Sequence, residues 1–134
     1  MRSIARNLHV VVTFLLVAAL VVQVWLAGRG VFESPTVFIT HRDVGYMLSL
    51  FPIVLLVLAL LGGMGRRPAM MAALIFGLLI LQSVFVVMRT SNPAIAALHP
   101  VNGFLILLVA LALLRGSWAM RNAATLAPTA APPR

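Results

Sequence analysis

The sequence predicts an all-α membrane protein, an up-and-down bundle of four transmembrane helices. The chain has 134 residues, 63% of them hydrophobic and 9% charged, and its mean hydropathy is +1.12. Soluble domains carry about 25% charged residues. Four apolar runs are long enough to cross a hydrocarbon layer of ~30 Å, which needs roughly 20 helical residues. One transmembrane domain over residues 1–115 therefore accounts for most of the chain.

We expect the spans at residues 8–27, 44–61, 69–88 and 94–115. The first run follows two arginines, as the core of a secretory signal does. Its roughly 20 residues exceed the usual 7–15 of such a core, so we expect it to remain as a membrane helix. A loop over residues 28–40 should join it to the second span, which Pro52 should kink.

The remaining connections are short. The glycine-rich residues 62–67 predict a tight turn before the third span. Asn92 and Pro93 are typical of a helix cap followed by a proline in the first turn. Pro100 interrupts the next helix, so residues 93–98 should form a short separate turn. The tail, residues 116–134, is rich in alanine and proline, and we expect it to be disordered in the cytoplasm.

The arginines predict the orientation of the bundle. All ten basic residues are arginines, and the net charge is +8. With both termini in the cytoplasm, seven arginines lie on the inner side and three on the outer side, which is the bias of bacterial inner-membrane proteins. We therefore predict a multi-pass protein of the cell membrane. The arginines form no basic face, which argues against nucleic acid as a partner. The absence of cysteine excludes thiolate metal sites.

Two of the three histidines lie in the same local pattern. His41 and His99 each precede a glycine by four residues, Gly45 and Gly103, at the start of an apolar run. Positions i and i+4 share a face of a helix, so each histidine should have an open patch one turn away. Both histidines should lie near the outer face. The third, His9, is expected to be an interfacial side chain at the cytoplasmic end.

The two halves of the chain resemble each other around these histidines. Gln23 stands 18 residues before His41, and Gln82 stands 17 residues before His99. Such halves would form two hairpins related by a pseudo-two-fold axis along the membrane normal. The second and fourth helices are then diagonal partners that bring the two imidazoles to one depth.

Two facing histidines in a bundle favour one b-type haem with two axial imidazoles. Imidazole is the most common metal ligand, and bundle interiors often hold such sites. Gly45 and Gly103 would leave room for the macrocycle, although small residues also let membrane helices pack with nothing between them. Polar residues within spans are costly and usually functional, which favours the cofactor. A copper site that adds a methionine is a less favoured use of the same histidines.

Other polar residues of the outer side are candidates for the rest of this site. Three arginines are candidates to pair with the haem propionates: Arg29, Arg42 and Arg89. Gln23 and Gln82 are candidates for hydrogen bonds to an imidazole or a propionate. Equally, the glutamines would serve as hydrogen bonds between helices.

The chain resembles a small family of four-helix bacterial membrane proteins of unknown function, through the pattern Gln23…His41-Arg42-x-x-Gly45…Gln82-Ser83…His99-Pro100-Val101-Asn102-Gly103. That resemblance implies the fold and no activity. His41-Arg42 is also similar to the histidine–arginine pair in one half of haem A synthase, which implies ligand roles for His41 and His99. The chain has only one half-length, and Glu33 lies eight residues before His41 instead of close to it. The resemblance therefore does not extend to hydroxylating catalysis.

Two functions stay open. One is a single-haem protein that passes electrons or senses redox state at the outer face. It would need a quinone or a redox protein as partner, because one haem near one surface cannot carry electrons across ~30 Å of hydrocarbon. The other is a cofactor-free accessory subunit of a larger membrane complex. Ion-coupled transport is disfavoured because no span interior holds a charge.

Overall fold

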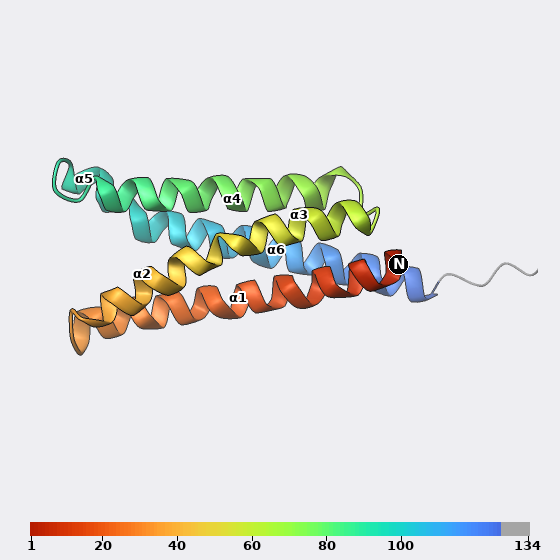
Figure 1. Cartoon of the computed structure of the whole chain (residues 1–134), viewed down its shortest axis with the longest axis horizontal. Helices are drawn as coiled ribbons and strands as arrows, with labels where there is room; N and C mark the ends of the chain where they lie inside the picture. The colour runs from red at the N-terminus through yellow and green to blue at the C-terminus, as the bar shows by residue number, and fades with distance from the viewer. Residues whose placement is uncertain (127–134) are drawn as a thin grey trace, which may run out of the picture.

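The computed structural model describes residues 1–126, and all of its regular structure is helical (Figure 1). Its helices are α1 (Arg2–Phe32), α2 (Val37–Leu48), α3 (Leu50–Leu61), α4 (Arg66–Val87), α5 (Pro93–Ala96) and α6 (Leu98–Leu126). They form four stretches long and apolar enough to cross a membrane, Arg2–Phe32, Val37–Leu61, Arg66–Val87 and Pro93–Ala123. The predicted fold class is confirmed, and the chain is a multi-pass membrane protein.

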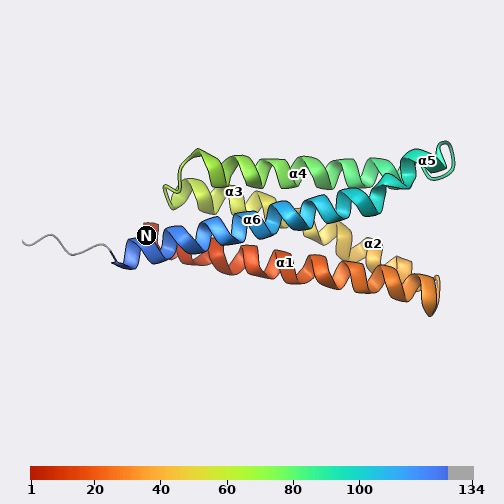
Figure 2. The same ribbon diagram turned by 180° about the vertical axis from the view of Figure 1, so that it is seen from behind.

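The bundle consists of two antiparallel hairpins, α1 with α2–α3 and α4 with α5–α6. The α2–α3 stretch crosses one side of the bundle (Figure 1), and α6 lies between α1 and α4 on the other (Figure 2). Both α1 and α4 contact α3 and α6, so the second and fourth spans are diagonal, as predicted. The N-terminus and the end of α6 lie together at one end of the bundle, called the terminal end. The opposite end, with the α1–α2 connection and α5, is called the histidine end.

The core lies along the bundle axis and takes one face from each span. Small side chains at Ala72 and Ala110, both fully buried, let the helices approach closely. Most other apolar side chains point outward, as lipid-facing residues do. The core residues are Leu16, Leu20, Leu48, Leu55, Ala72, Ile75, Ile106, Ala110 and Leu113.

The second span bends at Ser49, between α2 and α3. Pro52 has no N–H to donate to the Leu48 carbonyl four residues earlier. Three residues before the proline, the Ser49 N–H bonds to the Tyr46 carbonyl at 3.2 Å, in a turn tighter than that of an α-helix. The predicted kink is confirmed, and it lies just before the proline.

The first loop is shorter than predicted. The helix α1 continues to Phe32 and α2 begins at Val37, so only residues 33–36 of the expected loop, 28–40, are non-helical. An ion pair between Arg29 and Glu33, four residues apart, holds the last turn of α1 together. His41 therefore lies one turn inside α2.

The fourth span is longer than predicted. The helix α6 continues to Leu126, so the expectation of a disordered tail from Gly116 is wrong for these residues. No proline interrupts the sequence between Pro100 and Pro128, and alanine, leucine and methionine favour continuation of a helix that has already formed. Residues 127–134 of the predicted tail lie outside the described residues.

The two predicted connections around α4 are confirmed. Gly63 and Gly65 adopt positive φ angles of 56° and 82° in the α3–α4 turn. Arg6 of α1 donates from Nε to the Gly62 carbonyl at 2.8 Å, which anchors this turn to the first helix. At the other end of α4, the Asn92 side chain accepts a hydrogen bond from the Ile95 N–H at 3.2 Å and caps α5.

Candidate functional site

The structure brings His41 and His99 together at the histidine end. Their ring centroids are 6.1 Å apart, and the ring planes are inclined at 62°. Both rings are half-buried. Among the described residues, no Cα of α2 lies within 8 Å of a Cα of α4, α5 or α6. The two imidazoles therefore meet across a gap between the backbones of the two hairpins.

Each imidazole is held by a backbone carbonyl of its own hairpin. His41 Nδ1 lies 3.1 Å from the Gln23 carbonyl oxygen, and His99 Nδ1 lies 3.3 Å from the Gln82 carbonyl oxygen. A carbonyl can only accept, so Nδ1 carries the proton in both rings, and in a neutral imidazole Nε2 then has the free lone pair. Within the described part of the chain, neither Nε2 makes a hydrogen bond. Metal-bound histidines usually show this arrangement, with one nitrogen donating to a carbonyl and the other free for the metal.

The glutamine side chains pack against the two glycines. A Cβ atom added at Gly45 would lie 3.0 Å from Gln23 Nε2, and one at Gly103 would lie 3.4 Å from Gln82 Nε2. The open patches predicted one turn below the histidines are therefore partly filled by these amides. The same histidine–glutamine–glycine contacts recur in both hairpins, which supports the internal repeat.

The two hairpins differ in the hydrogen bonds that the side chain of each glutamine makes. Gln82 Oε1 accepts a hydrogen bond from Asn102 Nδ2 at 2.6 Å, and Asn102 also donates to the Leu78 carbonyl at 2.8 Å. Gln23 donates from Nε2 to the His41 carbonyl at 3.0 Å, but its Oε1 is buried without a partner. Buried polar atoms normally have a partner, so this oxygen is an acceptor available to a water or a ligand group.

Two further side chains support the site and were not predicted to do so. Phe38 meets the His41 ring edge-on, with centroids 6.3 Å apart, and packs against Gly30 of α1. Ala96 lies at the matching place before His99, so the second ring lacks this support. Asn102 is the other addition. Asn102 is part of the family pattern His99-Pro100-Val101-Asn102-Gly103, but that pattern does not indicate its hydrogen-bond partners.

Two of the three candidate arginines have acidic partners. Arg29 pairs with Glu33 and lies over the Trp25 ring at 4.9 Å, while Arg42 pairs with Asp43 at 2.8 Å. The hydrogen bonds from Arg29 lower the pKa of the Glu33 carboxyl. In the described structure Arg89 has no acidic partner, and it is exposed.

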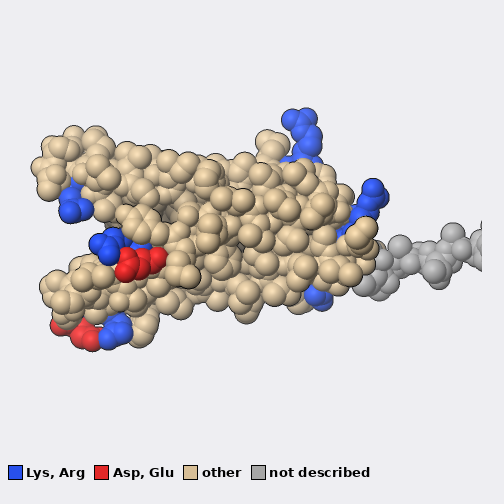
Figure 3. Space-filling model, in the orientation of Figure 1, with Lys and Arg blue, Asp and Glu red and all other residues tan. Residues whose placement is uncertain are grey.

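Figure 3 shows the molecule hollowed at the histidine end, between the two hairpins, with side chains of both signs around the hollow. The opposite end shows positive side chains alone in this view. The histidine pair therefore lies at the end where both acidic residues of the chain are found.

His9 is not the interfacial side chain that we predicted. It is 0% exposed and lies in the bundle, with Nδ1 3.1 Å from Ser117 Oγ and 3.4 Å from Thr13 Oγ1. Its Nε2 is buried without a hydrogen-bond partner. The face of α1 that carries His9 and Thr13 also carries Leu16 and Leu20, and all four point into the bundle. The prediction failed because position 9 was assigned to the membrane boundary, whereas α1 extends beyond it.

The structure offers two candidate metal ligands, His41 and His99, and no third one beside them in the described residues. No group of three or more histidine, cysteine, aspartate or glutamate side chains within residues 1–126 is placed to hold a metal ion. A site at His41 and His99 would therefore need further ligands from a group that is not part of the chain. A macrocycle with four ligand nitrogens meets that requirement.

Comparison with protein families gives one match. A family of unknown function (DUF6220) matches residues 23–90, which is just over half of the chain. The chain belongs to this family. No curated protein and no solved structure matches it.

The family match covers the site residues of the first hairpin of this DUF6220 protein and one glutamine of the second. It begins at Gln23 and includes His41, Gly45 and Gln82. His99 lies beyond its end, on α6. The contact between the two histidines thus joins the matched region to a helix outside it.

Proposed function

We propose that this DUF6220 protein binds one b-type haem between His41 and His99, with an electron-transfer or redox-sensing role. The observation that carries the proposal is the separation of the two rings. Imidazoles on opposite sides of one metal, with metal–nitrogen bonds of about 2 Å, have centroids roughly 6 Å apart. The 6.1 Å between these centroids matches that requirement. The free Nε2 lone pairs fit the role of axial ligands.

The chain offers partners for the remainder of such a group. His41 and His99 would supply the axial nitrogens, and the Gln23 and Gln82 carbonyls hold the rings and raise their basicity. Arg89, which is not engaged with an acid, is the best placed of the arginines by charge to pair with a propionate. When bound, the haem would supply one-electron chemistry, with a potential set by the two imidazoles and their partly buried surroundings.

We further propose that the histidine end faces the outside of the cell membrane, with both termini in the cytoplasm. The terminal end carries six of the described arginines and no acidic residue, whereas the histidine end carries three arginines and both acids. Short cytoplasmic segments carry the excess of basic residues. A haem at the outer end would exchange electrons with a quinone or with a redox protein at that surface.

The test is the visible spectrum of the full chain, purified in mild detergent from haem-replete cells. A reduced-minus-oxidised haem spectrum is expected, and His41→Ala and His99→Ala should each abolish it. His9→Asn is the matched control, because it changes the third histidine, at the far end of the bundle, and should keep the spectrum. A flat trace from a folded native chain would overturn the proposal, as would equal losses in all three variants.

One observation favours a second function, that of a cofactor-free accessory subunit in a larger membrane complex. The glutamine amides fill the space beside Gly45 and Gly103, and the histidines already have carbonyl partners. The same contacts would hold the hairpins together without a ligand. A partner that stays bound through purification, with no chromophore, would support this function.

A further inference from the structure

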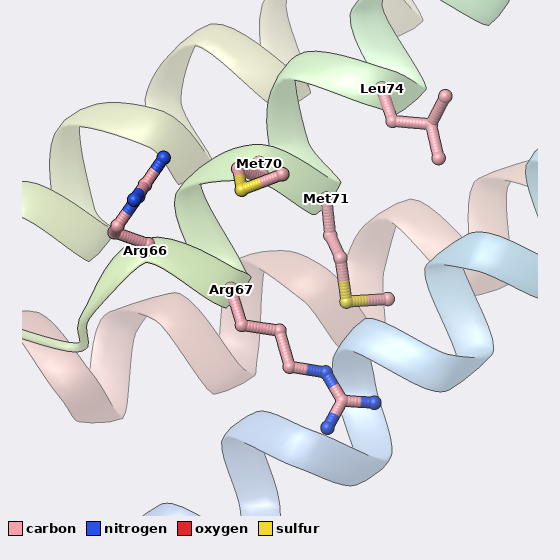
Figure 4. A pocket seen from close by; sticks show the side chains of 5 residues that line it. All are labelled: Arg66, Arg67, Met70, Met71 and Leu74. Carbon is pink, nitrogen blue, oxygen red and sulfur yellow. The ribbon is translucent and has the colours of Figure 1, made fainter.

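A groove lies on α4 at the terminal end, far from the histidine pair. It is about 730 Å³ in volume and is lined by Arg66, Arg67, Met70, Met71 and Leu74 (Figure 4). Two rows of side chains form it, because residues 66, 70 and 74 and residues 67 and 71 are each spaced by four on one helix. Figure 4 shows Arg67 and Met71 extended toward α6, whereas Arg66 points to the other side of α4 in this view, and Leu74 lies further along the helix.

The mouth of the groove carries positive charge that nothing in the described protein neutralises. Arg66 and Arg67 are exposed and make no ion pair or hydrogen bond within residues 1–126. The only acidic residues of the chain, Glu33 and Asp43, lie at the histidine end. Arginine suits a phosphate particularly well, because its planar guanidinium donates two parallel hydrogen bonds.

The floor of the groove is apolar and runs into the membrane-spanning part of α4. Met70 is 62% exposed and Leu74 is 50% exposed, so their side chains are open to lipid. From Arg66 to Leu74 the helix rises about 12 Å at 1.5 Å per residue. That length suits the first part of an acyl chain that lies along the helix below a headgroup held by the arginines.

We propose that this groove binds one anionic phospholipid, with its phosphate at Arg67 and an acyl chain along Met70, Met71 and Leu74, while the charge of Arg66 adds to the attraction of the headgroup. Basic pockets beside transmembrane helices are known to select anionic headgroups. The proposal is independent of the haem site, which lies at the other end of the bundle.

The test is native mass spectrometry of the full chain released from detergent, with phosphatidylglycerol or phosphatidylcholine of the same acyl composition. Phosphatidylglycerol should bind more tightly. In Arg66→Gln/Arg67→Gln its affinity should fall on the order of tenfold or more, since basic residues near a membrane surface attract anionic headgroups. The matched control is Arg2→Gln/Arg121→Gln, which removes the same charge from the same end outside the groove and should retain the affinity.

Three outcomes would overturn the proposal. Equal binding of both lipids would show that the groove does not select a lipid by the charge of its headgroup. An equal loss in both double variants would show general attraction to the basic end of the bundle. Displacement of phosphatidylglycerol by millimolar inorganic phosphate would show a site for free phosphate that makes no use of the acyl chain. Circular dichroism of each variant establishes that its helices are intact.

Discussion

Replacing Gly45 or Gly103 with alanine measures how tightly each glutamine is held beside its histidine. Both glycines lie inside helices, where alanine is favoured over glycine by about 1 kcal/mol. At Gly103 the new Cβ would lie 3.4 Å from Gln82 Nε2, an ordinary contact, so most of this gain should appear. At Gly45 the separation is 3.0 Å, and the Gln23 amide must move.

That movement should offset the helix gain at Gly45. It strains the 3.0 Å hydrogen bond from Gln23 Nε2 to the His41 carbonyl, and such a bond contributes about 1 kcal/mol. We therefore expect Gly103→Ala to raise the free energy of unfolding by roughly 0.5–1 kcal/mol and Gly45→Ala to leave it nearly unchanged.

The assay is denaturant unfolding in mixed micelles, followed by circular dichroism, on the cofactor-free chain. Equal effects of the two substitutions would refute the reasoning, because the glutamine amide lies closer to a Cβ at Gly45 (3.0 Å) than to one at Gly103 (3.4 Å). With haem added, both alanines should weaken its binding, since each places a methyl group one turn from an axial ligand. Unchanged haem affinity in both variants would contradict a site between the histidines.

Three further predictions test individual contacts of the bundle. Arg6→Gln removes a charged donor from the Gly62 carbonyl and should lower the free energy of unfolding by about 1.5–3 kcal/mol in the same assay, with partial recovery in Arg6→Lys. Asn102→Leu removes the donor to Gln82 Oε1 in this partly buried site and should lower the free energy of unfolding by roughly 1–3 kcal/mol; a neutral result would contradict this bond. The Glu33 carboxyl should titrate in NMR below the usual range of a glutamate, because the hydrogen bonds from Arg29 lower its pKa. Its contribution to stability is then complete at neutral pH and is lost as the pH falls through the lowered pKa.

Features set by local sequence were predictable. The apolar runs define the spans by length alone, Pro52 bends the second span because it removes one hydrogen bond, and Asn92 caps α5 through its own side chain. The repeated spacing of glutamine and histidine also placed His41 and His99 at the same depth, because it reflects the same hairpin built twice.

Features set by contacts between distant segments were not predictable. His9 is buried because Ser117, 108 positions away, lies beside it on α6. Asn102 on α6 donates a hydrogen bond to Gln82 on α4, and no pattern in the sequence specifies that partner. The tail was misjudged for a different reason. Extending a helix that has already formed avoids the cost of nucleation, so residues after a membrane span can stay helical without an apolar face as long as no proline interrupts them.

The central claim is that two imidazoles on different hairpins share one metal. Electron paramagnetic resonance of the oxidised chain with one equivalent of haem tests it most directly, because the spectrum reports the axial ligands themselves. A low-spin ferric signal is expected from the native protein, and it should be absent from both His41→Ala and His99→Ala. A high-spin signal from the native protein, or a low-spin signal that survives either substitution, would contradict the claim.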